Sequence, residues 1–180
     1  MIVLRETAIF TTTLLFVAAC ILNDVRTLRI PNRLTVPAML VGIALNACFA
    51  GWSGVQTSLG GFALATLVLL GPFALGGVGA GDVKMMSAVG TLLGPRLVFQ
   101  SLFIGIALGG VFAVVHLARI ARLQEKVWSL AQMVGAALTM RSLAPLKVSA
   151  GAPHAVVLPY SLPLGLGTLG VIALAMAGNS

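Results

Sequence analysis

Residues 97–118, which read LVFQSLFIGIALGGVFAVVHLA, decide the fold. The stretch contains no aspartate, glutamate, lysine or arginine, and a helix needs roughly 20 apolar residues to cross the core of a membrane. Comparable apolar blocks recur along the chain at residues 8–22, 34–50, 59–78 and 160–177. The sequence therefore predicts an all-α fold of membrane-spanning helices.

A shorter apolar block at residues 83–94 ends before Pro95, which cannot continue a helix without losing a hydrogen bond. We interpret it as a short sixth span. Residues 123–140 carry apolar side chains at helical spacing among polar ones, which is typical of an interfacial helix. Residues 141–159 are interrupted by prolines and glycine and are predicted to form a loop. We expect a single domain over residues 1–180, a polytopic bundle of about six transmembrane helices with an interfacial cytoplasmic helix.

The composition supports this interpretation and excludes other classes of protein. Of the 180 residues, 59% are hydrophobic and 8% are charged, far from the balance of a soluble domain. The net charge of +7 comes from isolated lysines and arginines at the ends of apolar blocks, so no nucleic-acid partner is expected. Cys20 and Cys48 lie inside apolar blocks without the spacing of a metal site, so neither a metal nor another cofactor is predicted.

The basic residues also predict the orientation, because cytoplasmic loops carry an excess of lysine and arginine. With six spans, nine of the eleven basic residues fall on one side, which we assign to the cytoplasm. They are Arg26, Arg29, Arg33, Lys84, Arg119, Arg122, Lys126, Arg141 and Lys147. Asp24 and Asp82 fall on that same cytoplasmic side, while both termini face outward.

Acidic residues are scarce: the chain has four, Glu6, Asp24, Asp82 and Glu125. An ionised side chain at bilayer depth costs on the order of 3 kcal/mol, so a retained acid calls for a reason. One reason is structural, since Asp82 at the start of a helix can accept from free N–H groups. The other is chemical, since two carboxyl groups at one membrane boundary can act together as acid and base.

The sequence around each aspartate separates these alternatives. In Gly79-Ala80-Gly81-Asp82, two glycines before the acid allow strained backbone angles or the close approach of another segment. After Asp24, the run Ile30-Pro31-Asn32 is interpreted as the turn between two spans.

Together these two stretches resemble the type IV prepilin peptidases, and in particular the small TadV and CpaA-like members that serve Flp-type pilus assembly. The matching residues are Asp24, Arg26, Ile30, Pro31, Asn32, Gly79, Gly81, Asp82, Val83 and Lys84. Pro159-Tyr160, before the last apolar block, is similar to the late Pro-Tyr pair of that family.

The resemblance implies an intramembrane aspartyl endopeptidase of the bacterial inner membrane, with its active site facing the cytoplasm. Asp24 and Asp82 would be the catalytic pair, supported by Gly79, Gly81 and Lys84. The partners implied are membrane lipids and a prepilin, bound through its leader peptide and its hydrophobic N-terminal helix. Larger members of the family also carry a cysteine-rich segment and methylate the new N-terminus. This sequence lacks that segment, so methyltransferase activity is not predicted.

Alternatives stay open at this point. Lys84 is either an anchor reaching the membrane interface or a cation that keeps an aspartate ionised. The protein could instead be a small ion or proton carrier, because acids in spans often relay protons. It could also be a non-catalytic pilus-assembly scaffold, because Gly105, Gly109 and Gly110 have the spacing of close helix packing.

Overall fold

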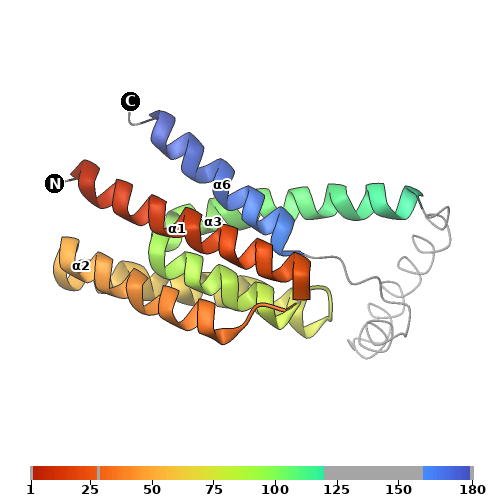
Figure 1. Cartoon of the computed structure of the whole chain (residues 1–180), viewed down its shortest axis with the longest axis horizontal. Coiled ribbons are helices and arrows are strands. Elements are labelled where there is room, and N and C mark those ends of the chain that lie inside the picture. Colours follow the sequence, from red (N-terminus) through yellow and green to blue (C-terminus); the bar gives the residue numbers. More distant parts are fainter. Residues whose placement is uncertain (1, 28, 120–159, 179–180) are drawn as a thin grey trace, which may run out of the picture.

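The computed structural model describes residues 2–27, 29–119 and 160–178. These residues form four α-helices, α1 (Ile2–Thr27), α2 (Asn32–Ala74), α3 (Ala80–Arg119) and α6 (Ser161–Gly178). Each helix is long and apolar enough to cross a membrane, which confirms the all-α fold. The predicted interfacial helix at 123–140 and the loop at 141–159 lie outside the described residues. Figure 1 shows a bundle with both chain termini at one end.

Two helices are broken at single glycines. Gly51 in α2 has φ 59° and ψ −139°, and Gly94 in α3 has φ 77° and ψ 178°. Glycine adopts positive φ without steric cost. The sequence predicts six separate spans, whereas the described residues form four helices, because the second and third predicted spans, and likewise the fourth and fifth, are joined through one residue instead of a loop.

The break at Gly51 folds α2 back on itself. The Ser58 hydroxyl oxygen lies 3.4 Å from the carbonyl oxygen of Gly42, 16 positions earlier. In a straight helix the same two residues would be about 24 Å apart. The two parts of α2, residues 32–50 and 52–74, therefore run side by side in opposite directions (Figure 1).

The break at Gly94 has the same effect on α3. The Thr168 hydroxyl lies 4.0 Å from the sulfur of Met86. A Cβ atom on the adjacent Gly167 would lie 2.6 Å from the backbone nitrogen of Gly105. One turn of α6 thus meets both Met86 and Gly105, which a straight helix would hold about 28 Å apart.

Polar side chains satisfy the backbone carbonyl groups that the second break exposes. Pro95 has no N–H, so the Thr91 carbonyl one turn earlier has no helical donor. The Asn46 amide nitrogen donates to Thr91 O at 3.1 Å, and the Ser58 hydroxyl donates to it at 2.8 Å. Arg5 Nη2 donates to Asn46 Oδ1 at 3.0 Å and so orients the amide. A broken helix inside a membrane requires such internal donors, because water is absent there.

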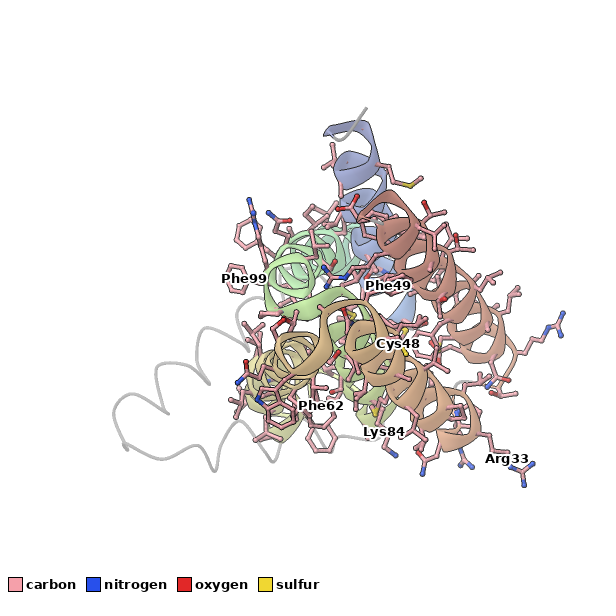
Figure 2. All side chains as sticks on the ribbon, turned by 90° about the vertical axis from the view of Figure 1, so that its left-hand side faces the viewer. Arg33, Cys48, Phe49, Phe62, Lys84 and Phe99 are labelled. Carbon is pink, nitrogen blue, oxygen red and sulfur yellow. The ribbon has the colours of Figure 1, made fainter. Side chains whose placement is uncertain are left out.

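The first part of α3, residues 80–93, lies in the centre of the bundle. Its core side chains Met85, Met86 and Val89 are completely buried. The outer surface of the bundle is also apolar, and Figure 2 shows Phe62 and Phe99 pointing outward from α2 and α3. An apolar exterior around a packed interior is what a lipid environment requires.

The glycines of α3 and α6 allow these helices to touch. A Cβ atom on Gly105 would lie 2.9 Å from the Cα of Leu164, and one on Gly109 would lie 3.7 Å from the ring of Tyr160. Gly110 has no such neighbour among the residues that the structure describes. The predicted close packing therefore holds for Gly105 and Gly109, and it places the start of α6 against α3.

Candidate active site

Asp24 and Asp82 come from distant parts of the sequence and lie at the same end of the bundle. Asp24 lies in the last turn of α1 and Asp82 in the first turn of α3. Figure 1 shows the end of α1 and the start of α3 together, opposite the two termini. Each aspartate is 8% exposed, and the two carboxyl groups are close enough to interact electrostatically. The two carboxyl groups are therefore buried within electrostatic range of each other.

Asp82 caps the helix on which it lies. Its Oδ2 accepts from the backbone N–H of Gly79 at 3.2 Å. In return, the Gly79 carbonyl accepts from the N–H groups of Asp82 and Val83, at 3.1 and 3.2 Å. The side-chain bond is one half of a capping box, in which an acid at the third helical position reaches back to the N–H of the capping residue; the carbonyl bonds belong to the first turn of the helix. The predicted structural role of Asp82, an acid that accepts from an N–H group at the start of its helix, is thus confirmed. The bond also fixes the direction of its carboxyl group.

Gly81 allows another segment to approach the start of α3. A Cβ atom there would lie 3.3 Å from the Cβ of Ile30, so any side chain would push Ile30 away. Gly79 and Gly81 are not among the described glycines with positive φ. Of the two reasons that the sequence offers for these glycines, close approach applies at Gly81 and backbone strain at neither position.

The connection from α1 to α2 is held by side chains that lie close to Asp24. Asn23 Nδ2 donates to the Arg29 carbonyl at 2.8 Å, and the Thr27 hydroxyl lies 3.1 Å from the same oxygen. Ile30 is buried, and Pro31 caps the start of α2 from outside the helix with an extended backbone. The predicted turn at Ile30-Pro31-Asn32 is confirmed. Through Ile30, it packs the segment that follows Asp24 against Gly81 at the start of α3.

Lys84 links the two motifs without touching a carboxylate in the described part of the chain. Its Nζ donates to Asn32 Oδ1 at 2.9 Å across the α2–α3 contact. The side chain is exposed, and Figure 2 shows it pointing outward at the same edge of the bundle as Arg33. The lysine therefore lies where an interfacial anchor would lie, and it also ties the beginning of α2 to the beginning of α3.

Ser161 is a site residue that the sequence does not single out. Its buried hydroxyl donates to Asp24 Oδ2 across 137 positions of the chain. The available signal was a hydroxyl residue directly after Pro159-Tyr160, at the point where the last apolar block begins. That signal is weak without knowledge that α6 begins beside the end of α1.

The described residues contain no group of three histidine, cysteine, aspartate or glutamate side chains that could hold a metal ion. Within the same residues, the second oxygen of each aspartate has no hydrogen-bond partner. Two buried carboxyl groups, each held by one oxygen, can share a proton and polarise a water molecule between them. Such a pair can hydrolyse an amide bond.

The fold and the site define a helical membrane protein with two buried acids at one end of its bundle. Residues 9–114, more than half of the chain, match the type IV leader peptidase family, and the chain belongs to this family. A prepilin leader peptidase/N-methyltransferase of Bacillus subtilis (strain 168) is 25% identical over 135 residues, or 72% of this chain and 52% of the relative. The chain thus spans about half the length of that curated relative. No solved structure matches the chain.

The match confirms the resemblance at the level of the family. Asp24 and Asp82 both lie within the matched residues 9–114. The narrower TadV and CpaA-like grouping stays a prediction, and so does the expected lack of methyltransferase activity.

Proposed function

We propose that this protein is an intramembrane aspartic endopeptidase that removes the leader peptide of type IV prepilins of the Flp type, with Asp24 and Asp82 as its catalytic pair. The observation that carries the proposal is the burial of these two carboxyl groups together at one end of the bundle, inside the segment that matches the peptidase family. Its substrate would be held through the basic leader and the hydrophobic N-terminal helix of the prepilin.

The chemistry follows from a proton shared by the pair. One aspartate is ionised and takes a proton from water, and the oxygen of that water attacks the scissile carbonyl carbon. The other aspartate is protonated and donates to the carbonyl oxygen, which gives a neutral tetrahedral diol. A proton then passes to the amide nitrogen, the C–N bond breaks, and the products are a leader with a carboxylate and a pilin with a free amine.

The pair favours hydrolysis over the two competing functions. A proton carrier would need acids near the middle of the membrane, whereas Asp24 and Asp82 lie at helix ends. A scaffold would need the glycine contacts of α3 and α6 but no paired acids. Neither alternative accounts for the burial of two carboxyl groups within range of each other.

The direct test is cleavage by the purified protein. In detergent micelles, it is expected to convert a purified prepilin into a shorter product whose N-terminus lies at the leader junction, as read by N-terminal sequencing. The B. subtilis relative, treated in the same way with its own prepilin, is the control for assay conditions. An intact prepilin in the presence of folded protein, under conditions in which the relative cleaves, would contradict the proposal.

The proposed topology has six crossing segments in one membrane domain, because each glycine break divides a long helix into two antiparallel parts. The acid pair would then face the cytoplasm of an inner membrane, with both termini outside. The exposed basic residues Arg26, Arg29 and Arg33, all near Asp24, support this orientation.

Cysteine labelling tests the orientation. In a protein with Cys48→Ser, which leaves Cys20 buried, a membrane-impermeant maleimide is expected to label Ser53→Cys in intact spheroplasts. Arg29→Cys is expected to be labelled only after the membrane is opened. Both positions are exposed. Arg29 lies in the connection from α1 to α2 and Ser53 lies two residues after the break at Gly51, and these two segments are at opposite ends of the bundle (Figure 1). The reverse pattern would show that the acid pair faces outward.

A further inference from the structure

The hydroxyl of Ser161 is positioned differently from three other buried hydroxyls of the bundle. Ser87, Ser101 and Thr168 each donate to the carbonyl oxygen four residues earlier in their own helix. This is the usual resting place of a hydroxyl inside a helix. Ser161 is the first residue of α6, so the described part of this helix offers no carbonyl one turn before it. Its proton is therefore available to Asp24.

Packing of α6 between two helices holds Ser161 in this place. A Cβ atom on Gly165 would lie 2.6 Å from Ile21 Cδ1 and 3.1 Å from Val17 Cγ1 of α1. Since Val17, Ile21 and Asp24 share one face of α1, the face that meets α6 is the face that carries the aspartate. Because Gly165 lets α6 pack directly against α1, the start of α6 has little freedom to move relative to Asp24.

The opposite side of α6 is fixed as well. A Cβ atom on Gly167 would lie 2.7 Å from the Ser101 carbonyl oxygen. Ser161 is completely buried, so water does not compete for its hydroxyl. A buried donor to a carboxylate forms a strong bond because the acceptor is charged.

We propose that Ser161 is a positioning residue for peptide cleavage: it holds one oxygen of Asp24 so that the other oxygen faces the water and the partner aspartate. The inference rests on the proposed function. It follows from the different surroundings of the two Asp24 oxygens. Oδ2 accepts from Ser161, whereas Oδ1 has no partner among the described residues. A carboxyl group held at one oxygen cannot rotate away from the reacting geometry.

Removal of the hydroxyl is expected to slow the chemical step. Ser161→Ala should lower kcat for prepilin cleavage about 10- to 100-fold, because small displacements of a reacting group have effects of this size. KM should stay within about twofold of the wild-type value, since the serine does not touch substrate. Ser161→Thr keeps the hydroxyl and should recover most of kcat.

The matched control is Ser101→Ala, which removes an equally buried hydroxyl that bonds only within its own helix. It should leave kcat unchanged. Thermal unfolding in detergent checks that each variant is folded. If threonine does not fit at position 161, Ser161→Cys takes its place in the comparison, because cysteine is close to serine in size and is a weak donor. Equal kcat in the alanine variant and wild type would overturn the inference, and so would equal loss in the alanine and the hydroxyl- or thiol-bearing variants.

The outcomes separate this inference from the proposed function. If wild-type protein does not cleave prepilin, the proposed function itself fails. If wild-type protein cleaves, Asp24→Asn does not, and Ser161→Ala cleaves at the full rate, then only the role of Ser161 fails.

Discussion

Replacement of Asp24 or Asp82 by asparagine is expected to abolish prepilin cleavage while leaving the protein folded in the membrane. Asparagine has nearly the shape of aspartate and can still accept from Ser161 or Gly79, but its amide can neither take a proton from water nor donate one to a carbonyl group. Acid and base assistance contributes about 10²- to 10⁴-fold each. Each single variant should therefore fall to the background of the cleavage assay, measured as the initial rate of product formation.

The control for this experiment is Glu6→Gln, which removes an acid at the other end of the bundle. Glu6 lines a groove with Arg96 and Gly178, far from the aspartates, and its variant should process prepilin normally. Cleavage by Asp24→Asn or Asp82→Asn above a tenth of the wild-type rate would exclude the catalytic pair. Proton flux into liposomes that is lost in the same variants would favour a carrier instead.

A methyl group at Gly61 is expected to disrupt the bundle. The Cβ of Gly61→Ala would lie 2.0 Å from the Gly90 carbonyl oxygen, and a Cβ on Gly90 would lie 2.3 Å from the Gly61 oxygen. Both obstacles are backbone atoms, so no side chain can rotate out of the way. Separating α2 from the central part of α3 should lower the free energy of unfolding by about 3 kcal/mol or more.

Gly60→Ala is the matched control, since it changes the adjacent residue of the same helix. Its Cβ would meet only the Pro95 ring, at an ordinary 3.9 Å. Alanine favours helix over glycine by about 0.8–1.0 kcal/mol, so this variant should be as stable as wild type or slightly more so. The midpoint of thermal unfolding in detergent compares the two, and similar midpoints would contradict the packing of α2 on α3.

The membrane helices could be predicted because apolar length is a strong signal. The block at 8–22 falls within α1, and the block at 160–177 matches α6 to within one residue at each end. Pro95 correctly marks the end of the short block, and the break itself lies one residue earlier, at Gly94. The residue before a proline is driven out of helical geometry, so the sequence and the structure agree there to within one position.

The reversal at Gly51 could not be predicted, because it takes a single residue. The sequence leaves residues 51–58 between two apolar blocks, yet apart from Gly51 they are helical. Nothing in the local sequence distinguishes Gly51 from glycines inside helices, such as Gly60. The conformation at Gly51 is determined by the contact of the two folded-back arms, which involves residues such as Gly42 and Ser58.

The two acids of the candidate site could be singled out from the sequence, but the side-chain contacts around them could not. Scarcity and the basic residues single out Asp24 and Asp82 and predict them on one side of a membrane, and the structure has both at one end of the bundle. The bonds of Asp24 to Ser161 and of Lys84 to Asn32 span 137 and 52 positions. Each depends on which helix ends meet, and a single sequence carries no direct signal of that.

The distance along the chain between Asp24 and Ser161 has a consequence for the timing of synthesis. A ribosome adds residues from the N-terminus at about 5–20 per second, so on the order of ten seconds separate the two residues. Until α6 has been made and inserted, Asp24 has no serine beside it and no last helix to close that side of the bundle. A partly synthesised chain would thus reach the membrane with both acids but without the contact that holds Asp24, and the final helix would supply that contact.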